Sequence, residues 1–154
     1  MGKDYAIISE KTFEKARNEI RKASGSGKRT LFISYDDEIG RKILEKEKVD
    51  VFMPALKGRR DFQKQRNSGF NHVLAKLAAK GGVAVGVSLD EIIGSRGRER
   101  AEILARIRQN IILCGKNDLG MRFIALNREN ARDVYGLKSL GSLLGMPTWM
   151  TRDL

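Results

Sequence analysis

Val83-Ala84-Val85-Gly86-Val87 is an uninterrupted apolar run, and it decides the fold class of this chain. A strand with one face in solvent alternates apolar and polar residues, whereas a strand covered on both faces is apolar throughout. Strands of the second kind lie in parallel sheets that helices cover on the outside. The pair Gly81-Gly82 ends a helical pattern immediately before the run. The run therefore predicts a buried strand of an α/β fold.

Outward from this strand, strand and helix patterns alternate along the chain. Short runs rich in β-branched and aromatic residues predict further strands at residues 5–8, 30–34, 49–53 and 121–126. Apolar residues at helical spacing predict helices after Ser9, after Asp36 or Asp37, and at about residues 70–80, 96–114 and 134–144. This alternation with short connections indicates a parallel sheet flanked by helices. Ligands of such sheets bind in the loops at the carboxyl ends of the strands.

The chain has 154 residues, and we expect them to form a single domain, residues 1–154. Cys114 is the only cysteine and His72 the only histidine, which excludes a zinc site of Cys/His type and a two-metal centre built on several histidines. The single cysteine gives no sign of an oxidising compartment, and residues 1–5 lack the apolar core of a signal peptide. We therefore expect a cytoplasmic protein with no membrane association.

Positive charge dominates the composition. Thirty Lys and Arg residues stand against nineteen Asp and Glu residues, which gives a net charge of +11 and a pI of about 10.0. Such an excess attracts phosphates and steers them to the surface, so it predicts a large polyanion as the partner. The alternative is a basic protein without any role in nucleic-acid binding.

One basic segment lies between an expected strand and the start of an expected helix. It has a single acid, Asp61, among the cations Lys57, Arg59, Arg60, Lys64 and Arg66. The amide N–H groups and the macrodipole at a helix start favour phosphate binding. A solvated loop without a ligand remains the alternative interpretation.

A second basic segment lies on the expected long helix and contains Arg96, Arg98, Arg100, Arg106 and Arg108. Guanidinium groups bind phosphate through two parallel hydrogen bonds. However, the i,i+4 pairs of Glu102 with Arg98 and with Arg106 could equally stabilise an exposed helix face. Neither segment contains an activated nucleophile or a carboxylate pair, and we expect no catalytic residue and no metal ligand in this chain.

Residues 68–77 resemble the signature segment of a known protein family. Ser68-Gly69-Phe70-Asn71-His72-Val73-Leu74-Ala75-Lys76-Leu77 resembles the signature of archaeal ribonuclease P protein component 3, which is related to the thirty-kilodalton subunit of the eukaryotic enzyme. The resemblance continues at residues 83–89, 97–101, 106–111 and 139–146. It covers about residues 40 to 146.

The resemblance implies a TIM-type (β/α) barrel, reduced or incomplete because a full barrel needs roughly 200 residues or more. It also implies a noncatalytic subunit of the ribonucleoprotein endonuclease that removes the 5′ leader of precursor tRNA. In that enzyme the RNA and its Mg²⁺ perform the hydrolysis, and the protein binds no cofactor. The implied partners are the ribonuclease P RNA, the component 2 protein and, indirectly, precursor tRNA.

The family positions expected to contact RNA include the basic loop, His72 and Arg132. Combined with the other cations near the signature, the predicted RNA-binding set is Arg59, Arg60, Lys64, Arg66, Asn71, His72, Lys76, Lys80, Arg98, Arg100 and Arg132. Two alternatives stay open at this point. One is a stand-alone metal-dependent phosphoesterase on a related barrel, and the other is a general basic RNA-binding protein.

Overall fold

The protein is built on five parallel strands whose order in the sheet is their order in the chain. The computed structural model describes residues 4–154. The first three residues of the segment 1–5, which was expected not to be a signal peptide, lie outside the described residues. The strands are β1 (Tyr5–Ile8), β2 (Arg29–Ser34), β3 (Val51–Pro54), β4 (Ala84–Ser88) and β5 (Met121–Ile124). Each strand pairs in parallel with the next, as in a TIM-type barrel. Within residues 4–154 β1 does not pair with β5, which makes the barrel incomplete and confirms the predicted fold class.

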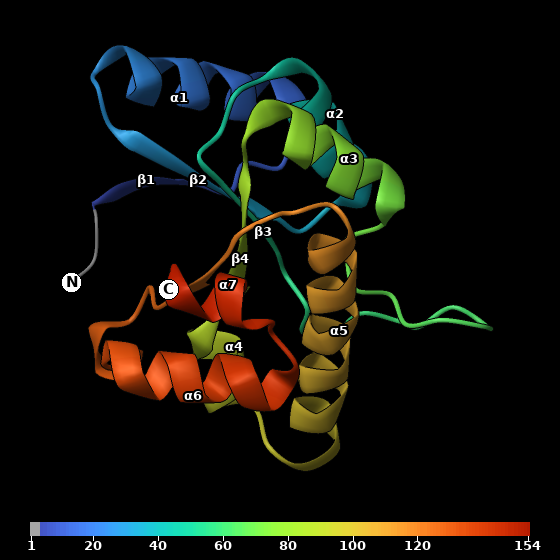
Figure 1. Ribbon diagram of the computed structural model, residues 1–154. Coiled ribbons are helices and arrows are strands. Elements are labelled where there is room, and N and C mark those ends of the chain that lie inside the picture. Colours follow the sequence, from blue (N-terminus) through green and yellow to red (C-terminus); the bar gives the residue numbers. More distant parts are fainter. Residues whose placement is uncertain (1–3) are drawn as a thin grey trace.

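Helices connect the strands and cover one face of the sheet (Figure 1). They are α1 (Phe13–Gly25), α2 (Asp37–Lys46), α3 (His72–Gly81), α4 (Leu89–Gly94), α5 (Gly97–Lys116), the 3₁₀ turn η1 (Arg128–Asn130), α6 (Val134–Leu144) and α7 (Thr148–Arg152). The expected helix start at Asp36 or Asp37 is confirmed at Asp36. This residue is the N-cap of α2, because its carboxylate accepts hydrogen bonds from the amides of Glu38 and Ile39. The N-cap of α1 is Thr12 rather than Ser9. The short helices α4 and α7 carry too few residues for a periodic pattern and were not predicted.

The two faces of the sheet are buried by different groups. On the outer face, Phe32, Phe52 and Val85 pack into the main core with the helices. On the inner face, Leu31, Ile33, Val51 and Met53 form a second, smaller apolar cluster. Alternate residues of one strand enter the two clusters, which explains why the central strands are apolar throughout.

Gly86 of β4 marks the curvature of the inner face. A Cβ atom at this position would lie 2.8 Å from Cβ of Met53 on the neighbouring strand. Glycine therefore lets the two strands curl toward each other, as a barrel requires. No helix among residues 4–154 is long and apolar enough to cross a membrane.

Candidate nucleic-acid interface

The loop between β3 and α3, residues 55–71, projects from the body of the protein beside α5 (Figure 1). Arg106 of α5 holds its first half. The Arg106 side chain is only 3% exposed, and it donates to the carbonyl oxygens of Leu56 at 3.1 Å and Arg59 at 2.8 Å. It also forms an ion pair with Asp61 at 3.1 Å. The i,i+4 pair of Arg106 with Glu102 is present at 4.0 Å, but the expectation that it lies on an exposed helix face is wrong for Arg106, because three acceptors from the loop surround the guanidinium and exclude water.

Asp61 links the two halves of this loop. Its carboxylate accepts from the backbone amide of Asn67 at 2.9 Å and pairs with Arg66 at 3.3 Å. The amide of Asn67, followed by the Arg106 guanidinium, lowers the pKa of the Asp61 carboxyl below its ordinary value. The carboxylate therefore stays ionised and keeps the loop closed on itself.

Two amide side chains of α5 hold the second half of the loop. Gln109 donates to the carbonyl of Arg66 at 3.0 Å and to the hydroxyl of Ser68 at 3.1 Å. Asn110 donates to the carbonyl of Ser68 at 3.2 Å. Together with Arg106 they lie at spacings of three and four on one face of α5. Sequence reasoning missed this role, because the partners lie more than 40 residues away in the chain.

Arg59 is part of the loop's internal structure. Its side chain is 10% exposed and it contacts the carbonyl of Ala55, Asp37 at 2.9 Å and the amide oxygen of Asn67 at 3.2 Å. All of these partners lie within the protein. Arg59 therefore shapes the loop and does not present its charge on the surface, unlike the other predicted cations of this segment.

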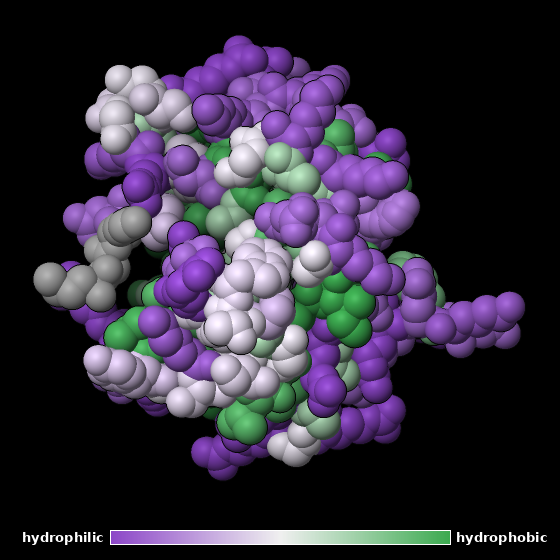
Figure 2. All heavy atoms as spheres, in the orientation of Figure 1, coloured by the Kyte–Doolittle hydropathy of each residue, from purple (hydrophilic) through white to green (hydrophobic). Residues whose placement is uncertain are grey.

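The tip of the loop carries the free charge. Arg60 and Lys64 are exposed, and neither forms an ion pair with another side chain within the described residues. In Figure 2 hydrophilic residues dominate the projecting segment. The tip thus presents two cations on a loop whose base is fixed by α5.

A second set of exposed polar side chains follows the loop on α3, and its charge comes from two lysines. His72, Lys76 and Lys80 are four residues apart and exposed, so they form one stripe along the helix. Asn71 is the N-cap, and its side chain accepts from the amide of Leu74 at 2.9 Å. The first turn of α3 contains no acid. We call His72, Lys76 and Lys80 the α3 stripe.

The remaining predicted residues are distributed differently. Arg98 is 93% exposed and pairs with Glu102 at 3.0 Å. Arg100 donates to the carbonyls of Ile92 and Ile93 and so caps the end of α4. Arg132 lies between η1 and α6, a segment that Figure 1 places across the molecule from the loop. The structure therefore places the base of the loop and the start of α3 beside one cleft, which residues 65–72 help to line. Arg100 and Arg132 lie apart from that cleft.

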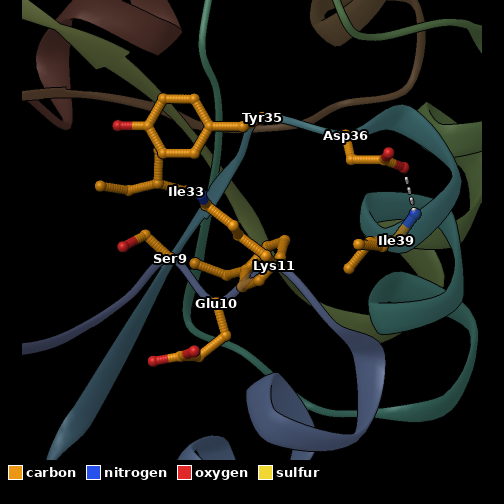
Figure 3. Close-up of a pocket in the computed structure, with 8 residues that line it drawn as sticks. Ser9, Glu10, Lys11, Ile33, Tyr35, Asp36 and Ile39 are labelled. Atoms are coloured by element: carbon orange, nitrogen blue, oxygen red, sulfur yellow. Dashed lines mark hydrogen bonds between the residues drawn. The ribbon is translucent and has the colours of Figure 1, made fainter.

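A pocket of about 600 Å³ lies at the carboxyl ends of β1 and β2, where TIM-type barrels place their ligands (Figure 3). Its polar wall consists of Ser9, Glu10, Lys11, Tyr35 and Asp36. The Asp36 carboxylate already accepts hydrogen bonds from the amides that begin α2. The Glu10 side chain points away from Asp36, so the two carboxylates do not face each other (Figure 3). Within residues 4–154 no group of three His, Cys, Asp or Glu side chains could hold a metal ion.

These features define the class of the protein: an incomplete TIM-type barrel with a basic loop and a basic helix on one side. The chain is homologous to ribonuclease P protein component 3, as its signature segment predicted. It is 27% identical over 147 residues to that protein of Methanococcus maripaludis strain C7, and 32% identical over 117 residues to that of Methanococcoides burtonii. These matches cover 96% and 72% of this chain, but 59% and 44% of the relatives.

A solved structure gives the same result. A chain in the cryo-EM structure of archaeal ribonuclease P with mature tRNA superposes with a TM-score of 0.78 at 25% identity. The match covers 94% of this chain and 61% of that chain. The similarity therefore extends beyond residues 40 to 146, and this chain spans about three fifths of that protein. No family model matches the chain.

Proposed function

We propose that this chain acts as a noncatalytic, RNA-binding subunit of an archaeal ribonuclease P. The observation that carries the proposal is a set of exposed cations that form no ion pair within residues 4–154: Arg60 and Lys64 at the loop tip, and Lys76 and Lys80 on α3. These side chains lie on a loop held by three residues of α5 and on a capped helix. A rigid array of cations binds phosphates without losing the conformational freedom that a mobile loop would lose.

The proposed mechanism is charge neutralisation. Arg60, Lys64, Arg66, Lys76 and Lys80 lower the repulsion between phosphates of the ribonuclease P RNA and release counterions. Asn71 and His72 add hydrogen-bonding groups at the start of α3, and Arg98 extends the surface along α5. Arg59, Arg100 and Arg132 act through the protein's own structure or at a separate contact.

In this proposal the RNA and its Mg²⁺ hydrolyse the leader of precursor tRNA, and the chain itself binds no cofactor. The component 2 protein is the proposed protein partner, and the cytoplasm the proposed location. These assignments follow from the family resemblance, and the similarity to named component 3 proteins supports only the ribonuclease P family itself.

The salt dependence of RNA binding tests the proposal. In the double variant Arg60→Ala/Lys64→Ala, about two phosphate contacts are lost, so the log–log salt slope should become shallower by about 1.4 to 1.8. Filter binding to ribonuclease P RNA at several salt concentrations measures the slope. The control is Lys15→Ala/Lys22→Ala on α1, which removes the same charge elsewhere. Equal slopes for the two variants would contradict the proposed surface.

Reconstitution tests the noncatalytic role. The chain added to the RNA and the component 2 protein should increase leader cleavage at low Mg²⁺, and the chain alone should cleave nothing. Cleavage by the chain in the absence of RNA would overturn the assignment of catalysis to the RNA.

A further inference from the structure

A cleft of about 790 Å³ lies between the loop and the beginning of α3, beside the starts of α2 and the middle of α5. Its volume lies in the range of small-ligand sites, about 300–1,000 Å³. Four separate elements form its walls: α2, the loop, α3 and α5. The Arg106, Gln109 and Asn110 contacts fix the loop to α5, and the Arg59–Asp37 ion pair fixes it to α2. The cleft is therefore a shaped feature of the fold.

An aromatic ring lines this cleft without being buried. Phe62 is 57% exposed, although its neighbours in the loop are polar or charged. An exposed phenyl ring at this position adds nothing to the core, since it belongs to neither apolar cluster. Exposed aromatic rings beside basic groups are the usual surface on which unpaired bases stack.

The cleft also has hydrogen-bonding groups that are free of internal partners. The amide of Gln65, the side-chain amide nitrogen of Asn71 and the ring of His72 form no hydrogen bond within the described residues. Gln109 uses its nitrogen to hold the loop and leaves its amide oxygen unpaired within residues 4–154. Neutral donors and acceptors of this kind read the edge of a base.

The charges of the cleft favour a base over a phosphate. Its acids, Asp37 and Glu38, are paired with Arg59 at 2.9 Å and Lys42 at 3.2 Å. Its cations Arg41 and Arg66 are paired with Glu45 at 2.8 Å and with Asp61. The wall is therefore close to neutral, whereas the unpaired cations lie outside it at the loop tip and on α3.

We propose that this cleft binds one unpaired nucleotide of an RNA strand, with its base stacked on Phe62. The flanking phosphates lie against the α3 stripe and the loop tip, and the free amides contact the edge of the base. Paired bases cannot enter, because their edges and faces are already engaged in the duplex. This inference rests on the proposed RNA-binding function and names the part of the RNA that the surface recognises.

The test compares a single-stranded RNA oligonucleotide with a duplex of the same length. Phe62→Ala should weaken binding of the single strand about tenfold, which is the usual effect of losing one stacked base, and change duplex binding less than twofold. Phe62→Tyr keeps an aromatic ring and should bind like the unaltered chain. Tyr35→Ala removes another exposed aromatic ring outside the cleft and is the matched control.

The outcomes separate the inference from the proposed function. Single-strand binding that is unchanged in Phe62→Ala, but reduced in Arg60→Ala/Lys64→Ala, overturns the nucleotide site and leaves the RNA-binding role intact. Failure of the unaltered chain to bind either RNA overturns both. An equal loss for single strand and duplex in Phe62→Ala also overturns the site, because stacking on an unpaired base is then not involved.

Discussion

Gly69 shows how one residue determines the shape of the basic loop. Its φ of +65° lies in the left-handed region, and a Cβ atom there would lie 2.9 Å from Cβ of Pro54 and collide with the Arg59 guanidinium. The same glycine amide donates to Asn67 at 3.3 Å. Arg59 fills the space beside Gly69, so any larger residue at position 69 would displace the Arg59 side chain. Arg59, which was predicted to contact RNA, therefore has a structural role in the loop.

Gly69→Ala should destabilise the protein more than Gly82→Ala does. Both glycines have a φ of +65°, but a Cβ at Gly82 meets nothing within 4 Å. The left-handed backbone alone costs about 1 kcal/mol, so this is the expected loss for Gly82→Ala. Overpacking against Pro54 and Arg59 adds to it, giving about 2–4 kcal/mol for Gly69→Ala. Urea denaturation measures both, and equal losses would show that the space at Gly69 does not matter.

At the scale of elements, the sequence pattern was most informative where contacts are local. The range of α6 was predicted to the residue, and Asp36 was one of two predicted caps of α2. The pairing of Arg106 with Glu102 is present, but the burial of Arg106 was missed, because an i,i+4 spacing is a local pattern that any exposed helix could show. Its other partners, Leu56 and Asp61, are 50 and 45 residues away and become neighbours only when the loop packs on α5. The loop's shape therefore could not be predicted from spacing.

The dependence of the loop on α5 predicts a large effect of Arg106→Met. Removing the guanidinium leaves two loop carbonyls without their donor and takes one of its partners from Asp61, and the two lost carbonyl bonds alone should cost about 2–4 kcal/mol. Trypsin should also cleave faster at Arg60 and Lys64, because the loop loses its anchor. Arg98→Met is the control, since its exposed i,i+4 pair contributes only about 0.3–0.5 kcal/mol. Comparable stability and cleavage rates in the two variants would contradict an anchoring role.

At the scale of the molecule, hydrophobic pattern alone predicted the α/β class and all five strands, while the barrel topology came from the resemblance. In the sheet order β1-β2-β3-β4-β5, each strand lies beside the strand that precedes it in the chain. No single segment of the sequence predicts this order of neighbours. Alternate residues of each central strand divide between the helix-covered outer core and the smaller inner cluster. The outer core joins helices from both halves of the chain, so we expect it to unfold as one unit.

Cys114 reports on this cooperative unit, because its thiol lies fully buried on α5 within the outer core. Burial raises the pKa of the Cys114 thiol to about 12, so very little of the reactive thiolate forms in the folded protein at pH 8. Reaction with a thiol reagent should therefore require unfolding, and proceed at least about a thousandfold more slowly than in urea-unfolded chain. The destabilised Gly69→Ala variant should react faster by the same factor by which its unfolding equilibrium constant rises, about tenfold for each 1.4 kcal/mol of stability lost. Rapid labelling of the native chain, or labelling insensitive to Gly69→Ala, would show that α5 opens locally without the rest of the core.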